Sequence, residues 1–161
     1  AGPRAAGPAL LADEVGAPVP GSYAWPVLGP VLRPFEPPST PFGAGHRGID
    51  IGAPVGTPVR AAQAGVVAFA GAVAGSLFVS IDHADGVRTT YSWVSAVLVV
   101  PGQAVARGQV VARTGQGHPG SAPPHLHFGA RLGDLYLDPM LLLGPRSVVG
   151  LVHLAPLEKG P

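Results

Sequence analysis

Short apolar runs rich in β-branched residues recur through the middle of the chain, separated by glycine, proline and Asp-Gly breaks. Runs of this length and composition predict β-strands rather than helices. No long window keeps a helical periodicity free of Gly or Pro. We therefore predict an all-β fold, a single antiparallel β-sheet or sandwich core, with strands at residues 66–70, 77–81, 88–91, 97–100 and 109–113.

Two further patterns indicate how these strands connect. Asp85-Gly86 lies between two of the apolar runs and suits the positive φ angles of a type I′ hairpin turn. Residues 55–68 and 101–112 share an order of glycines and valines that indicates two similar β-hammerhead-like halves. Biotin and lipoyl carrier domains have the same pattern, but their chemistry requires a lysine at a hairpin tip. The single lysine, Lys159, lies near the end of the sequence, which disfavours a carrier function.

Proline spacing divides the chain into three parts. Closely spaced prolines in residues 1–40 fix φ and remove backbone donors, so this part is expected to be an extended arm. Residues 41–145 form the predicted β core domain, and residues 146–161 a C-terminal tail with one short strand and a frayed end. Apolar residues should make the arm pack on the domain from about residue 22 onward: Tyr23, Trp25, Val27 and Leu28.

Composition narrows the classes of partner. Charged residues make up 12% of the 161 residues and the formal net charge is +1, which is too little positive charge to follow a nucleic-acid backbone. Gly and Pro interrupt every apolar stretch before it reaches the length of a transmembrane segment, so none is predicted. There are no cysteines, which leaves His and Asp as ligands for a transition metal. The sequence pattern predicts no particular oligomeric state.

Two motifs supply such ligands. In "HRGID", an even spacing returns His46 and Asp50 to one side of an extended segment. Taken alone, this motif is interpreted as a hydrogen-bonded surface loop, with metal binding as the alternative. In "PPHLHF", His125 and His127 are two residues apart, so in a strand they project from one face about 7 Å apart. One of them can bind a metal while the other faces a substrate. Together the motifs offer two imidazoles and a carboxylate, which would leave a fourth tetrahedral position on Zn²⁺ open.

The order of these motifs resembles the lysostaphin-type zinc metalloendopeptidases of bacterial cell walls over residues 43–143. The resemblance implies an antiparallel β-sheet with a groove along it, Zn²⁺ as cofactor, and His46, Asp50 and His127 as the metal ligands. It implies that His125 is a catalytic histidine. The implied substrate is a peptide of peptidoglycan, which would place the protein outside the cytoplasmic membrane, secreted or associated with the cell wall.

One position departs from the family pattern. Trp93 in "YSWV" stands where a second catalytic histidine is usual, and indole cannot take a proton from water. Two functions follow: a zinc endopeptidase in which another group replaces that histidine, or a catalytically impaired zinc-bearing relative that binds the wall or activates a hydrolase. His118, in the loop at residues 115–124, is interpreted as a solvated loop histidine, with the alternative that it reaches the metal from the far side.

The remaining histidines and aromatic residues are assigned no chemistry. His83, just before the predicted hairpin turn, is interpreted as structural, and His153 as solvated. Aromatic residues at strand positions are more often part of a core than of a binding site. No binding role is therefore predicted for Tyr91, Trp93 or Tyr136.

Overall fold

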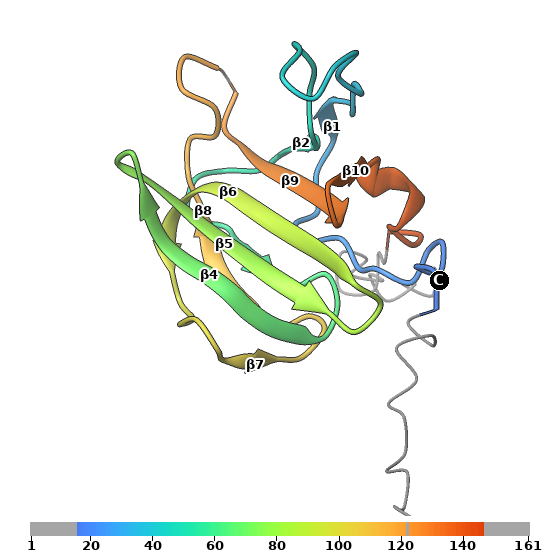
Figure 1. Cartoon of the computed structure of the whole chain (residues 1–161). Helices are drawn as coiled ribbons and strands as arrows, with labels where there is room; N and C mark the ends of the chain where they lie inside the picture. Colours follow the sequence, from blue (N-terminus) through green and yellow to red (C-terminus); the bar gives the residue numbers. More distant parts are fainter. Residues whose placement is uncertain (1–15, 122, 147–161) are drawn as a thin grey trace, which may run out of the picture.

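The computed structural model describes residues 16–121 and 123–146. Over this part of the chain the protein is a strongly twisted antiparallel sheet, and the segments before β1 and after β10 pack beside it (Figure 1). The elements are β1 (Val31–Arg33), β2 (Ile49–Gly52), β3 (Pro58–Arg60), β4 (Gly65–Val73), β5 (Ser76–His83), β6 (Val87–Val97), β7 (Ala104–Val105), β8 (Val110–Thr114), β9 (His125–Leu132), β10 (Leu135–Leu137) and the 3₁₀ turn η1 (Pro139–Leu141).

The strands form one hydrogen-bonded sheet in the order β1-β2-β9-β6-β5-β4-β7, with β10 beside β9 and the β3–β8 pair joined through β6. Every strand pairing is antiparallel. The predicted all-β, antiparallel fold is therefore confirmed. Within the described residues, no helix is long and apolar enough to cross a membrane.

Three of the five predicted strands lie within observed strands, and the one at residues 109–113 overlaps β8 in all but its first residue. The prediction for residues 97–100 is wrong beyond its first residue. β6 ends at Val97, and residues 98–100 are not in a strand, although the Leu98 amide still donates to the Val111 carbonyl of β8. The Val100 amide donates to the Gln103 side-chain oxygen instead of to a neighbouring strand. Pro101, which follows, has no amide proton to continue a ladder.

The β5–β6 hairpin forms at the predicted position but with a different turn. Three residues connect His83 to Val87, and among them only Gly86 has a positive φ, of 83°. A type I′ turn needs two central residues with positive φ. The hairpin therefore has a three-residue loop ending in glycine, and the type I′ prediction is wrong.

The two halves of the internal repeat pair with each other. β3 from the first copy pairs with β8 from the second, and β4 from the first pairs with β7 from the second. At Gly65, an added Cβ would lie 2.3 Å from the Asp82 carbonyl oxygen, so only glycine permits this close approach.

Strand alternation separates a core face from a polar face. On β9, Leu126 and Phe128 are fully buried, and they lie opposite Ile51 and Ile49 of β2. The Tyr91 ring of β6 packs on Phe128 with ring centroids 5.3 Å apart. Because side chains alternate between faces with a period of two, the residues between these apolar positions project from the opposite side of the sheet.

The predicted packing of the N-terminal arm is confirmed for three of its four apolar residues. Tyr23 is fully buried, Val27 is buried, and Trp25 packs against the core, whereas Leu28 is 45% exposed. The Tyr23 hydroxyl donates to Asp85 of the hairpin loop. Tyr23 also forms a parallel bridge with Leu143, so residues before and after the sheet hold each other. His153 and the predicted terminal strand lie largely outside the described residues.

His83 is structural, as predicted. It is buried, its Nδ1 lies 2.9 Å from the Ala64 carbonyl oxygen, and its Nε2 lies 2.7 Å from the Thr89 hydroxyl. A carbonyl only accepts, so Nδ1 carries the proton and Nε2 accepts from Thr89. Burial lowers the pKa of His83, although the Ala64 hydrogen bond and nearby carboxylates partly oppose this. The native protein therefore favours neutral His83.

This lowered pKa predicts a pH-dependent stability. Below pH 6.5 the unfolded chain binds a proton at His83 that the folded chain resists, so the free energy of unfolding should fall with decreasing pH, by at most about 1.4 kcal/mol per unit. Urea unfolding of the metal-free protein at pH 7.5 and 5.5 measures this. His83→Gln should show a smaller difference between the two pH values, and an identical difference would contradict the assignment.

Candidate metal centre

The pairing of β2 with β9 brings the two sequence motifs together. Asp50 lies directly opposite His127, and Gly52 lies opposite His125, in the antiparallel register. Both strands bury their apolar residues on the other face, so these polar side chains share the polar face. The Asp50 Oδ1 and His127 Nδ1 atoms are 2.9 Å apart.

His46 joins this pair from the segment that precedes β2. Its backbone forms a two-way bridge with Glu36, and its Nδ1 lies 2.8 Å from the Pro34 carbonyl oxygen. The carbonyl can only accept, so His46 carries its proton on Nδ1 and presents the lone pair of Nε2. That Nε2 lies 3.1 Å from Asp50 Oδ1. The arm thus orients one side chain of the cluster through its backbone.

Gly48 in the same motif permits the approach of His127. A Cβ at this position would lie 2.8 Å from His127 Nε2 and 2.4 Å from the Phe128 carbonyl oxygen. No side chain fits in this gap. The glycine in "HRGID" is therefore needed for the geometry of the pair and not for a turn.

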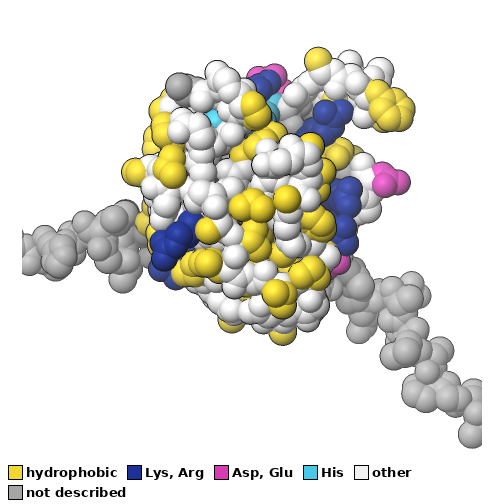
Figure 2. Space-filling view, turned by 90° about the vertical axis from the view of Figure 1, so that its left-hand side faces the viewer, with side chains coloured by type: hydrophobic (Ala, Val, Ile, Leu, Met, Phe, Trp, Pro, Cys, Tyr) yellow, Lys and Arg dark blue, Asp and Glu magenta, His cyan; other side chains and the backbone are white. Residues whose placement is uncertain are grey.

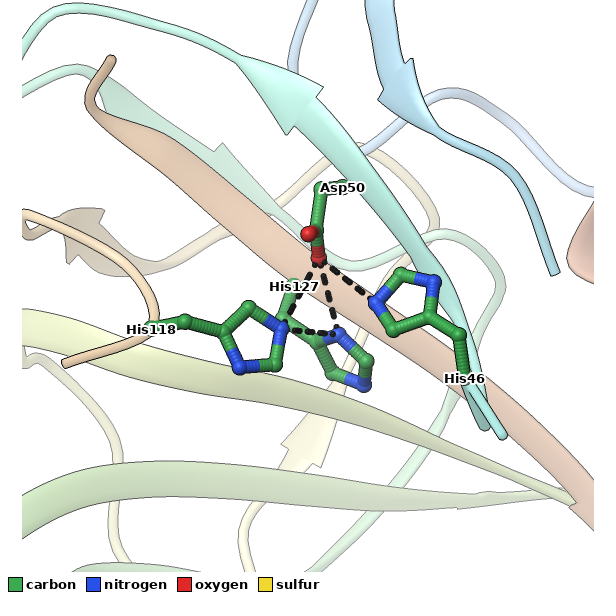
Figure 3. Close-up of side chains that lie close together, drawn as sticks. All are labelled: His46, Asp50, His118 and His127. Carbon is green, nitrogen blue, oxygen red and sulfur yellow. Dashed lines mark hydrogen bonds and ion pairs between the residues drawn. The ribbon is translucent and has the colours of Figure 1, made fainter. Parts of the chain in front are cut away.

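His118 is the residue for which the preferred sequence interpretation is wrong. Its side chain is 23% exposed and lies inside the cluster, with Nε2 3.1 Å from Asp50 Oδ1 and 3.1 Å from His127 Nδ1 (Figure 3). It is not a solvated loop histidine, since its ring also packs on Trp93. The position of the glycine-rich loop directly before "HLH" indicates that His118 lies near His125 and His127, but the sequence does not indicate the direction of its side chain.

The cluster has the donor set and spacing of a metal site. One ligand atom from each of His46, Asp50, His118 and His127 lies within 4.8 Å of the others. The four closest contacts are 2.9–3.1 Å long, near the edge of about 3.3 Å expected for tetrahedral zinc with bonds of about 2.0 Å. The unprotonated His46 Nε2 facing a carboxylate oxygen would be repulsive without a proton or cation between them. The residues therefore fit a zinc ion.

The charge state of the cluster suits cation binding. Burial raises the pKa of the Asp50 carboxyl, whereas the hydrogen bond with His127 and the neighbouring imidazole charges lower it by more, to about 2. Asp50 is therefore a carboxylate at neutral pH. Burial lowers the pKa of His118, with Asp50 partly opposing, so its neutral form and lone pair are favoured.

His125 borders the cluster without belonging to it. Its Nε2 lies 3.6 Å from Asp50 Oδ2 and accepts a hydrogen bond of 3.1 Å from the His118 backbone N–H. Its Nδ1 lies 3.0 Å from the Pro123 carbonyl oxygen, which fixes the proton on Nδ1. The side chain is 3% exposed. Both ring nitrogens are thus occupied in this arrangement.

Trp93 lies in a bulge of β6 beside the cluster. Its φ is +56°, in the left-handed region, which costs a residue with a Cβ about 1–2 kcal/mol. The register of β6 against β5 shifts next to it. The indole packs on three rings, with centroid distances of 5.8 Å to Phe78, 4.1 Å to His118 and 5.5 Å to His127. These contacts hold the strained backbone and place an aromatic wall against the metal-site histidines.

A polar groove runs from His127 along the sheet. Most of its lining comes from β5, β6 and β9, and three of the lining residues are arginines. The groove is lined by Arg47, Ser80, Arg88, Thr90, Ser92, His127, Gly129, Ala130, Arg131 and Tyr136. Asp82 forms an ion pair with Arg88, with Nε to Oδ1 at 2.6 Å. On the face drawn in Figure 2, histidine surface reaches the exterior only in small areas. The side chains of the cluster are largely buried, at 3–23% exposure, beside a groove that is more cationic than anionic.

Comparisons with known proteins agree with this fold. The sequence model of Peptidase family M23 matches residues 44–139, a range that includes all four residues of the cluster. The solved structure of the antimicrobial peptidase lysostaphin from Staphylococcus simulans superimposes with a TM-score of 0.64 at 28% sequence identity. That match covers 78% of this chain and 54% of lysostaphin.

Two curated relatives share more sequence. An uncharacterized protein of Mycobacterium tuberculosis is 41% identical over 126 residues, or 74% of this chain and 50% of that protein. The DD-carboxypeptidase/endopeptidase Mpg of Neisseria meningitidis serogroup B is 41% identical over 101 residues, or 62% of this chain and 23% of that protein. This chain thus spans half or less of the length of these two relatives. The family match covers more than half of the chain, which therefore belongs to peptidase family M23.

Proposed function

We propose that this chain is a zinc-dependent endopeptidase that hydrolyses peptides of bacterial peptidoglycan. The observation that carries the proposal is the convergence of one carboxylate and three imidazoles beside a polar groove. Family membership supports peptide hydrolysis, and one relative is named a DD-carboxypeptidase/endopeptidase. Peptidoglycan lies outside the cytoplasmic membrane, so we propose an extracytoplasmic location, secreted or associated with the wall.

The proposed zinc ligands are His46 through Nε2, Asp50 through Oδ1 and His127 through Nδ1. His46 and Asp50 are buried, and the Pro34 carbonyl fixes the His46 tautomer so that Nε2 points inward. A carbonyl that accepts the N–H of a ligand imidazole orients the ring and raises the basicity of its other nitrogen. Zinc held this way would lower the pKa of a water molecule toward neutrality and polarise a peptide carbonyl.

His125 is the proposed catalytic histidine. The Pro123 carbonyl keeps the proton on Nδ1, so Nε2 is the nitrogen that can accept a proton. Nε2 lies 3.6 Å from Asp50 Oδ2, at the edge of the cluster. Once protonated there, it can stabilise the developing oxyanion or donate to the leaving amine.

The groove suggests how a substrate peptide is held. Arg131 is four residues beyond His127 on β9, on the same face and about 13 Å away. Arg88 already pairs with Asp82, whereas Arg131 adds positive charge at the far end of the groove. Guanidinium groups bind carboxylates in a bidentate fashion. The substrate we expect therefore carries a carboxylate at that distance from the bond that is cleaved.

A second function is favoured by one observation. The resemblance to lysostaphin-type endopeptidases implies that Trp93 stands where a catalytic histidine is usual, and its indole offers no lone pair to a proton. A zinc-bearing protein of this fold without turnover could bind the wall or activate another hydrolase. The two functions differ in whether new peptide termini appear.

The first prediction concerns peptide release. Zinc-loaded protein incubated with purified, cross-linked peptidoglycan should generate new peptide termini, detected by mass spectrometry. His127→Ala should generate none, because it removes a ligand whose Nδ1 lies 2.9 Å from Asp50. If the folded, zinc-loaded wild-type protein leaves several types of wall unchanged, the binding or activating function is favoured instead.

The second prediction concerns Gly48. Gly48→Ala should weaken zinc binding about 10- to 100-fold, because the new Cβ would displace His127. Competition with a chromogenic chelator measures the affinity. The matched control is Gly16→Ala, where a Cβ meets nothing within 4 Å. Equal affinities of the two variants would show that His127 does not depend on this gap.

The third prediction concerns Trp93. Trp93→His should increase the rate of peptide release, because a positioned general base contributes about 100-fold or more. Histidine also tolerates the left-handed conformation better than most residues do. Initial rates at equal zinc loading provide the measurement. A folded variant with no gain would mean that the missing histidine is not the limiting defect.

A further inference from the structure

His118 occupies a position that the three proposed ligands leave open. Its Nε2 is 3.1 Å from Asp50 Oδ1 and 3.1 Å from His127 Nδ1, which is the spacing between ligand atoms on one metal ion. In Figure 3 its imidazole reaches the carboxylate from the side opposite His46. His118 Nε2 therefore lies where a fourth ligand atom of the same metal ion would lie.

The position of His118 is held by its surroundings. The Trp93 indole packs on its ring at 4.1 Å, and its backbone N–H donates to His125 Nε2 at 3.1 Å. Gly117 permits this position of His118. Its φ is +91°, and an added Cβ would lie 2.3–2.5 Å from three atoms of the His125 ring. The chain can approach His125 this closely only through a glycine.

We propose that His118 is a fourth protein ligand of the metal, and that it closes the site in the resting protein. This inference rests on the proposed zinc site. A fourth protein ligand takes the position that catalytic zinc sites keep for water or substrate. The same residue covers His125, because its amide uses the Nε2 lone pair that proton transfer requires. Displacing His118 alone would free both the coordination position and the catalytic nitrogen.

The geometry favours this role over that of a replacement proton acceptor. A general base lies within hydrogen-bond reach of the water it activates, and so stands one atom further from the metal than the ligand atoms do. His118 Nε2 instead approaches two ligand atoms at 3.1 Å and leaves no room for a water between them. Trp93, in the place of the usual histidine, supplies the wall that keeps His118 there.

Cobalt(II) substitution of the full chain tests the proposal without depending on turnover. The visible spectrum of the cobalt-loaded wild-type protein should be unaffected by sodium azide, because all four positions are filled. His118→Ala should have an altered spectrum that responds to azide, and its zinc affinity should fall by at least about tenfold. Gln116→Ala, an exposed change in the same loop, should behave like the wild-type protein.

Gly117→Ala provides a second variant that keeps the imidazole. Its Cβ should push the chain away from His125 and make the cobalt spectrum responsive to azide. Unchanged spectra and zinc affinity in His118→Ala would overturn the proposal, especially if peptide release were lost, since His118 would then be a proton acceptor. A closed site also predicts faster release by His118→Ala. If neither protein cleaves the wall while the spectra change as expected, the peptidase function fails and the fourth ligand stands.

Discussion

The register between β2 and β9 is the constraint on which both the core and the candidate site depend. It places Asp50 opposite His127 and, one residue along, Phe128 opposite Ile49. A slip of one residue would turn the apolar set to the polar face and bury the imidazoles among them. The burial of Phe128 and Leu126 therefore stabilises the arrangement of the metal-site side chains as well as the fold.

The buried structural histidine His83 and the histidines of the cluster differ in the partner atoms of their ring nitrogens. His83 is buried, but one nitrogen meets a carbonyl and the other a hydroxyl, so a single neutral tautomer satisfies the site. In the cluster, three imidazole nitrogens converge on one oxygen of Asp50. No choice of neutral tautomers gives each contact a proton when Nδ1 of His46 already holds one. A cation bound between these atoms would satisfy all three contacts. Convergence on one oxygen therefore distinguishes a candidate metal ligand from a structural histidine more clearly than burial does.

The sequence was sufficient to predict the all-β fold and most of the central strands, because these follow from the alternation of side chains over short distances. Its failures share a physical cause. The position of His118 depends on a loop that crosses His125 at Gly117, and the conformation of Trp93 depends on a bulge in pairing with a separate strand. Neither is encoded in local propensity. The role of the Pro34 carbonyl was missed because a backbone acceptor has no sequence signature.

The contacts of the N-terminal arm change where the functional unit begins. The family match starts at residue 44, after Pro34, whose carbonyl fixes the His46 tautomer, and after Tyr23, which bridges to Leu143. A protein trimmed to the matched residues would keep all four side chains of the cluster. It would nevertheless lose the acceptor that orients one of them and the residue that seals one end of the core. In this chain, the boundary of the family match and the boundary of the candidate metal centre are therefore different.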